Sequence, residues 1–164
     1  MIEVQEMKNS EIEQVLRRVS YGHLACARDN RPYIVPIHYA YDKPNIYVYT
    51  TEGMKTDIIK DNPHVCLQIE EVVDIDDWRS IVVNGDAEQI TDQNEREEAV
   101  KLILSTNPTL TPAISIRWMD DWVRENREIV YRIKPSIVTG RSSVKVKIKA
   151  AFAQPVGQRK SDIC

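Results

Sequence analysis

The sequence predicts a mainly β fold of the α+β class: an antiparallel barrel of six strands, closed or nearly closed, with a few covering helices. Short runs of β-branched and aromatic residues alternate with turn segments such as DNRP and DKPN, a pattern typical of an antiparallel meander. Only a few segments between them carry apolar residues at helical spacing. Closure into a barrel is expected because it removes the unpaired edges of an open sheet.

The six predicted strands account for most of the apolar runs in the chain. Pro36 lies inside the second run and cannot donate a hydrogen bond to a sheet ladder, so we expect it at an edge or a bulge. Irregular pairing there would free backbone groups for a ligand. The predicted strands are residues 23–27, 33–41, 46–50, 65–72, 79–90 and 128–138.

Helices are predicted where apolar residues recur every three or four positions. Ser10 and Glu13 form a capping box before one such stretch, and Asp92 and Glu95 form the corresponding start of another. A brief helix after the third strand ends where Asn62-Pro63 disfavours continuation. The predicted helices are residues 10–20, residues 55–61, the helix that begins at Asp92, and residues 117–126.

The bulk composition is that of one ordinary soluble domain. The chain has 164 residues, of which 42% are hydrophobic and 29% charged, and its net charge is -3. This balance does not favour nucleic acid or an anionic membrane as a partner. No apolar run approaches the roughly 20 residues of a membrane-spanning helix, and the N-terminal segment lacks the apolar core of a signal peptide. We therefore expect a cytoplasmic protein.

The C-terminal segment differs in composition from the rest. We expect a domain over residues 1–140 and a basic tail over residues 141–164 that forms an edge strand or is disordered. Lys145, Lys147 and Lys149 alternate with apolar residues, a period of two that is typical of a strand with one charged face. RNA binding by this tail is an alternative, although no aromatic residues that stack on bases are interleaved with its lysines.

Several motifs of catalysis and nucleotide binding are absent. The sequence has no GxGxxG, no phosphate-binding loop, no GxSxG and no HExxH. The spacing of His23 and Cys26 puts them on opposite faces of a strand, so they do not share a metal, and we expect no metal site. Cys26 and Cys66 lie in apolar stretches, where a reduced thiol behaves as a small hydrophobic group.

The segment EGMKT, residues 52–56, combines features that favour an anion. Gly53 lets the backbone turn after a strand, and Lys55 follows where a short helix begins. A helix N-terminus presents unpaired N–H groups and the positive end of its dipole, which together favour phosphate. Lys55 adds a full charge, and Thr56 adds a hydroxyl. An ordinary turn without a ligand is the alternative interpretation.

Four separated motifs then occur in the order of a known family. A strand of small residues, GHLACA, is followed by PYIVP, by IYVYTTEGMK and by RSIVVNG. In spacing and order these resemble the FMN-binding split-barrel family related to pyridoxamine 5'-phosphate oxidase, and especially its nitroimidazole-resistance branch. The resemblance covers roughly residues 10–105. It implies a six-stranded antiparallel split β-barrel that binds FMN.

The resemblance also implies the position of the flavin ring and phosphate. Val35, Pro36 and Ile37 would lie against the isoalloxazine ring, with backbone groups serving its polar edge. Lys55 would bind the FMN phosphate; the local chemistry of the turn, rather than the resemblance, adds the Thr56 hydroxyl beside it.

Two further segments complete the implied site. Tyr49, Thr50 and Thr51 would touch the ring and the ribityl chain. Arg79 and Ser80 would reach the flavin from its other side. Without the resemblance, strand propensity alone explains the hydroxyl residues among them.

The same resemblance implies an FMN-dependent oxidoreductase of the nitroreductase or flavin-reductase kind, with a small-molecule electron donor and acceptor. We assign no catalytic residue. A homodimer with flavin at the interface is implied. Trp118, Met119 and Trp122 are candidate contacts, and packing within their own subunit is the alternative. The second strand holds Val35 and His38 where pyridoxamine 5'-phosphate oxidase carries basic residues, so we do not expect that activity. A flavin- or haem-binding storage protein without turnover is the alternative.

Overall fold

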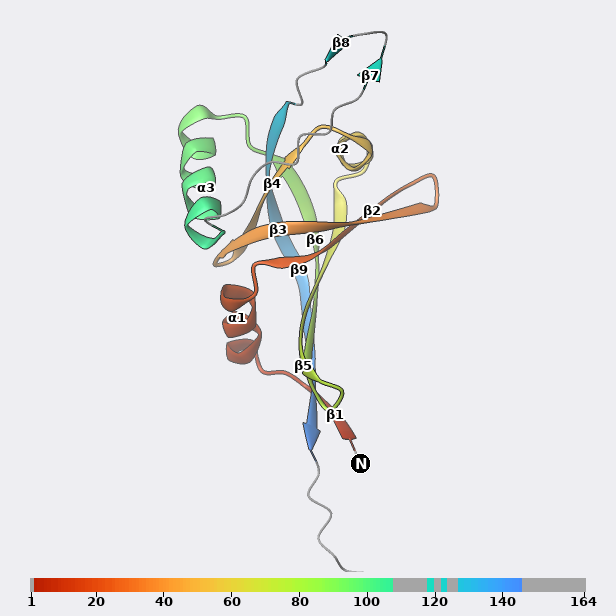
Figure 1. The fold of residues 1–164 in the computed structure, drawn as a ribbon, viewed down its shortest axis with the longest axis vertical. Coiled ribbons are helices and arrows are strands. Elements are labelled where there is room, and N and C mark those ends of the chain that lie inside the picture. Colours follow the sequence, from red (N-terminus) through yellow and green to blue (C-terminus); the bar gives the residue numbers. More distant parts are fainter. Residues whose placement is uncertain (1, 108–117, 120–121, 124–126, 146–164) are drawn as a thin grey trace, which may run out of the picture.

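The structure, a computed structural model, describes residues 2–107, 118–119, 122–123 and 127–145. Strands dominate it, and three helices lie among them (Figure 1). In chain order the elements are β1 (Ile2–Glu6), α1 (Asn9–Arg18), β2 (Tyr21–Arg28), β3 (Arg31–Asp42), β4 (Asn45–Thr51), α2 (Met54–Asp61), β5 (His64–Asp74), β6 (Asp77–Gln89), α3 (Gln93–Thr106), β7 (Trp118–Met119), β8 (Trp122–Val123) and β9 (Glu128–Lys145).

Seven of the strands form one antiparallel sheet that closes on itself. Its order is β1-β9-β4-β3-β2-β5-β6, and β6 also pairs with β9. Six strands therefore form a ring, and β1 extends the sheet by pairing with the C-terminal end of β9. The predicted mainly β fold, a six-stranded antiparallel barrel with a few covering helices, is confirmed.

The ring opens between β3 and β4. These strands pair only where Tyr39–Asp42 faces Asn45–Val48. Beyond that point β4 continues to Thr51 with β9 on its other side, whereas Arg31–His38 pairs with β2. In the described part of the chain, this first half of β3 and the last residues of β4 have no partner strand on the sides that face each other. The barrel is split at this place.

Pro36 lies on the open edge of β3, as its sequence predicted. The backbone N–H of Tyr39 donates to the Ser20 carbonyl at 3.0 Å, and the β2–β3 register is regular from there to the turn. Backbone groups alternate in direction along a strand, so those of Pro32 and Pro36 point away from β2. Neither proline removes a donor from the ladder.

The barrel encloses the main core. Buried side chains of alternate strand residues meet inside it, and α1 and α2 add apolar residues at its two ends. Tyr39 is fully buried, and its hydroxyl donates to the Leu16 carbonyl of α1 at 3.1 Å. A smaller cluster lies outside the barrel, where α3 covers β3, β4 and β9; its members are Ala40, Ile90, Ala99, Ile103 and Val130.

One predicted helix start is confirmed and the other is wrong. Asp92 caps α3, because its carboxylate accepts a hydrogen bond from the Glu95 N–H at 2.9 Å. α1 begins earlier than the predicted Ser10 cap: the backbone N–H of Lys8 donates to Glu11 at 2.7 Å. Glu11 and Glu13 each lie three residues after a possible cap, Lys8 and Ser10 respectively. Glu11 is the one that closes the first turn.

The predicted helix over residues 117–126 is also wrong. Trp118–Met119 and Trp122–Val123 are instead two short strands, β7 and β8, that pair with each other. Tryptophan and valine favour extended pairing, and their spacing is compatible with either structure. The side chains of the candidate dimer contacts Trp118, Met119 and Trp122 lie outside the described residues.

β9 continues past the expected end of the domain. It pairs with both β6 and β1 near its C-terminal end and stops at Lys145, while residues 146–164 lie outside the described part. β1, which pairs with this extension, is absent from the predicted elements. None of the helices in the described part has the length and apolar character needed to cross a bilayer.

Candidate functional site

The N-terminus of α2 carries a positive charge that has no counter-ion among the residues that the structure describes. The Lys55 ammonium is half-buried and donates to the Thr51 carbonyl at 3.2 Å. Within the described residues, no carboxylate lies within ion-pair distance of it. Burial lowers the pKa of the Lys55 ammonium, because removal from water disfavours the charged form. An anion placed here would gain both from this charge and from the free N–H groups of the first helical turn.

The hydroxyl of Thr56 closes the turn instead of facing solvent. The side chain is fully buried. Its hydroxyl donates to the Gly53 carbonyl at 2.7 Å and accepts from the Gly53 N–H at 2.9 Å. Thr56 therefore holds the turn on which Lys55 sits, and a ligand could use its hydroxyl only by displacing one of these bonds.

Two of the predicted segments flank the opening of the barrel. Val35, Pro36 and Ile37 lie on the unpaired edge of β3, and Thr50 and Thr51 lie on the facing end of β4. Ile37 and Thr50 are buried, whereas Pro36 is exposed. The structure thus brings the β3 and β4 segments to one opening, and the Lys55 hydrogen bond joins α2 to the same end of β4.

Tyr49 belongs to a different environment from its neighbours. Its ring packs against the cluster under α3. Burial and a hydrogen bond to the Glu128 carboxylate raise the pKa of Tyr49 to about 12, and Arg96 lies 3.6 Å from the same carboxylate. Strand alternation explains the placement, since residues 49 and 50 point to opposite faces of β4.

Arg79 lies far from Lys55 within one chain. It contacts Glu71 at 3.2 Å and Asp77 at 3.3 Å and pairs in register with Ser142 at the β5–β6 turn end of the sheet. Val65 pairs with Cys26, which interacts electrostatically with Lys55, and Glu71 lies six positions further along β5. Six residues of strand span about 20 Å. The structure therefore does not bring Arg79 to the Lys55 end.

Ser80 points to the opposite face from Arg79. It pairs with Glu70, and its neighbours on that face of the sheet include Val82 and Gln68. Ser80 is half-buried and lies on the outer face of the barrel. Arg79 instead lines a polar cavity beside α1.

Three rings near the opening escaped the sequence interpretation. The Tyr21 ring contacts the His23 ring edge-to-face at 5.6 Å between centroids and the His38 ring at 5.4 Å. His23 also contacts Gln68 at 3.2 Å. His38 follows the Val35–Ile37 segment directly. The cluster could have been predicted from the β2–β3 register, which places Tyr21 opposite His38. The position of the DNRP turn in the sequence would have been enough to predict that register.

Comparison with known proteins agrees with this fold. The sequence profile described as pyridoxamine 5'-phosphate oxidase matches residues 8–142. A protein of Rhizobium meliloti (strain 1021) is 40% identical over 82 residues, which are 50% of this chain and 54% of that protein. This chain thus spans about half the length of that relative.

Two solved structures superimpose over most of the chain. A FAD-binding protein from Mesorhizobium loti is 28% identical, with a TM-score of 0.71 over 88% of this chain and 100% of that one. A proposed 5-nitroimidazole antibiotic resistance protein from Bacteroides thetaiotaomicron is 19% identical, with a TM-score of 0.67 over 87% and 89%. At that identity the second likeness concerns the fold alone. The nitroimidazole-resistance protein is therefore one of several solved structures that share the fold of this chain. Since the family profile covers most of the residues that build the split barrel, this chain belongs to the pyridoxamine 5'-phosphate oxidase family.

Proposed function

We propose that the chain is a flavoprotein that binds FMN at the opening between β3 and β4. The phosphate lies at the N-terminus of α2, and the isoalloxazine lies along the open edge of β3. Membership of the family and the likeness to the FAD-binding protein of Mesorhizobium loti support a flavin. FMN and FAD share the ribityl phosphate, so the same contacts serve either cofactor.

The half-buried Lys55 ammonium is the single observation that carries this proposal. Its only hydrogen bond in the described structure goes to the neutral Thr51 carbonyl, and burial already disfavours its charge. Such a charge is costly unless a partner compensates it. Lys60, a second lysine on α2, is exposed and lies near the Asp57 carboxylate, so its charge does not require a ligand as a partner.

The open edge of β3 supports the placement of the ring. The backbone groups of Ile34 and Pro36 and the N–H of His38 point away from β2, and no residue of β4 in the described part is in register with them. Ile34 and His38 thus present N–H donors, and the Pro36 carbonyl between them is an acceptor. The polar edge of an isoalloxazine carries donors and acceptors in alternation, which suits such an edge.

We infer an oxidoreductase of the flavin-reductase or nitroreductase kind. Bound FMN supplies transfer of electrons or hydride, and the protein supplies binding and orientation. Lys55 holds the phosphate, and the β3 edge fixes the ring. The Tyr21–His23–His38 cluster lies beside that edge and lines the approach of a small-molecule donor or acceptor.

A homodimer is part of the proposal. A row of small and apolar side chains crosses the outer face of β3, β2 and β5: Ile34 pairs with Ala25, and Ala25 with Cys66. Ile34 is 62% exposed. A second copy on this face would cover the row and bring its own Ser80, which lies on the same face, near the flavin of its neighbour. Light scattering on wild type and Ile34→Lys tests this, since we expect a dimer that the lysine dissociates; a wild-type monomer at micromolar concentration contradicts it.

The cofactor is tested first by its identity. The protein is purified, the bound chromophore is released, and mass spectrometry distinguishes FMN, FAD and haem. Bleaching of the flavin bands by a nicotinamide donor then distinguishes an oxidoreductase from a storage protein. Haem, or absence of any chromophore together with no binding of added FMN, would refute the flavin.

The position of the phosphate is tested by Lys55→Ala. We expect FMN binding to weaken about tenfold to hundredfold, or about 1.5–3 kcal/mol, the scale of a charge-assisted hydrogen bond. Riboflavin lacks the phosphate and should be insensitive. Lys60→Ala on the same helix is the matched control and should change neither affinity. Titrations of the apoprotein with FMN, FAD and riboflavin give the answer; equal losses for FMN and riboflavin would place the phosphate elsewhere.

A further inference from the structure

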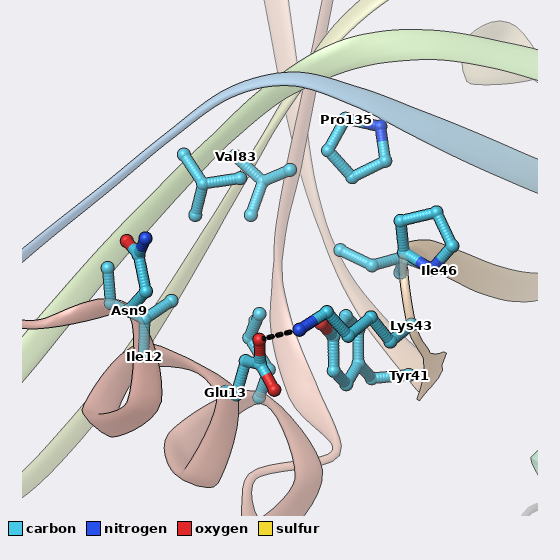
Figure 2. Close-up of a pocket in the computed structure, with 11 residues that line it drawn as sticks. Asn9, Ile12, Glu13, Tyr41, Lys43, Ile46, Val83 and Pro135 are labelled. Carbon is cyan, nitrogen blue, oxygen red and sulfur yellow. Dashed lines mark hydrogen bonds and ion pairs between the residues drawn. The ribbon is translucent and has the colours of Figure 1, made fainter.

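A second cavity lies between α1 and the barrel, apart from the β3–β4 opening. Its volume is about 330 Å³, and it forms where β9 has left β4 after Ile133 and has not yet met β1 at Arg141. Figure 2 shows side chains of α1, β3, β4, β6 and β9 directed toward it. None of the residues proposed to hold the flavin lines it.

The floor of this cavity is apolar and belongs to the core. Ile46 and Val83 are fully buried, and Ile12 and Leu16 are nearly so. The side walls are Pro44, Pro135 and Val138, and Val138 is 38% exposed at the rim. The remaining lining residues are Asn9, Glu13, Tyr41 and Lys43.

The charges at the rim compensate one another. The Lys43 ammonium and the Glu13 carboxylate are 2.5 Å apart (Figure 2). The Arg17 guanidinium lies over the Tyr41 ring at 5.2 Å, and Asp42 also acts electrostatically on Tyr41. The two charged residues that line the cavity, Glu13 and Lys43, compensate each other, so its lining carries no net charge. A charged ligand would have to displace the Glu13–Lys43 pair, whereas a neutral ligand can leave it in place.

We propose that this cavity binds a small neutral aromatic molecule of one or two fused rings that carries one hydrogen-bonding group. Protein interiors are normally close-packed, and ligand sites begin at about 300 Å³, with apolar walls and a few polar groups. An apolar cavity of about 150 Å³ already admits benzene. The ring enters between Val83 and Pro135, and the polar group reaches Asn9 or the Glu13 carboxylate at the rim.

Indole is the probe, because it is neutral, bicyclic and a hydrogen-bond donor. Calorimetry of the full-length wild type with indole should give saturable binding with a dissociation constant of about 1 mM or tighter. Methyl resonances of Ile12 and Ile46 should shift on titration, a readout that needs no variant. Indole-3-acetate, which adds a negative charge, should bind more weakly than indole.

Two tryptophan substitutions on β9 localise the binding. Val138→Trp fills the cavity from the rim and should weaken indole binding at least about tenfold. Ile137→Trp is the matched control: it is the adjacent residue, it is 59% exposed and it points to the other face of β9, so binding should persist. FMN content should be the same in both variants.

Each outcome decides the proposal. Loss in Val138→Trp alone, with methyl shifts in the wild type, supports it. No saturable binding to the wild type, equal effects of the two substitutions, or methyl shifts confined to residues outside the cavity would overturn it. Tighter binding of indole-3-acetate than of indole would overturn the choice of a neutral ligand.

Discussion

Replacement of Thr56 by valine should destabilise the turn that carries the proposed phosphate site. Valine has the shape of threonine but has a methyl group in place of the hydroxyl. The fully buried Thr56 hydroxyl bonds both the carbonyl and the N–H of Gly53, so Thr56→Val removes two hydrogen bonds without changing the packed volume. Thr56→Ser is the matched control, because it keeps both bonds and removes only a methyl group.

The two variants differ in expected cost. A hydrogen bond contributes about 0.5–1.5 kcal/mol net, and a buried donor left without a partner costs more, so Thr56→Val should lower the free energy of unfolding by about 2–3 kcal/mol. Loss of one buried methyl group in Thr56→Ser costs about 1 kcal/mol. For a chain of this size these figures correspond to falls in Tm of about 4–12 °C and about 2–4 °C.

Thermal unfolding of flavin-free protein, followed by circular dichroism, measures this difference. FMN titration on the same samples should show weaker binding in Thr56→Val than in Thr56→Ser, because the turn that positions Lys55 is loosened. A valine variant at least as stable as the serine variant would show that the two bonds do not hold the turn, and Thr56 would then not be the residue that fixes the start of α2.

Further predictions concern the frame around the site. Gly85→Ala places a Cβ 2.3 Å from the Lys134 carbonyl oxygen, so urea unfolding should show a loss of about 2 kcal/mol or more, as for other overpacked sites. The Arg18 hydrogen bond and charge lower the pKa of Glu71. The ionised Glu71 carboxylate therefore stabilises the fold above its unfolded pKa of 4.5, and this stabilisation is lost as pH falls through its lower folded pKa. Glu71→Gln should therefore be less stable than wild type at pH 7, with a gap that closes in acid.

Most of the sheet could be predicted from the sequence because its signals are local. The turn segments DNRP and DKPN separate three strands, and both turns are where the sequence puts them. β1 is different: among the described residues, this short edge strand pairs with residues 141–145 of β9 alone. No local pattern indicates a pairing between segments so far apart in sequence, so β1 was missed. Residues 141–145 were expected as an edge strand or a disordered tail, and not as a continuation of the last strand.

The candidate site divides in the same way. Lys55 could be singled out as a candidate because the glycine, the lysine and the helix start lie next to one another in the sequence. Within the described residues, no carboxylate lies at ion-pair distance from its ammonium. Arg79 lies at the end of the sheet that carries Glu71 and Asp77, and its guanidinium forms ion pairs with both carboxylates. The motif predicts only that Arg79 occurs in the expected order along the chain. The strand register decides whether its side chain can reach the same ligand as Lys55.

Consecutive residues of a strand cannot all present side chains to one ligand. The motif at Tyr49, Thr50 and Thr51 treats them as a unit, yet alternation sends the Tyr49 ring to α3 and buries Thr50 on the opposite face. What consecutive residues can share is an unpaired backbone edge. β3 and β4 offer two such edges where they part, and Pro36 on the first of them was the one sequence signal of the opening. The backbone of the split, together with Lys55, is therefore the element of this site on which flavin affinity should depend most.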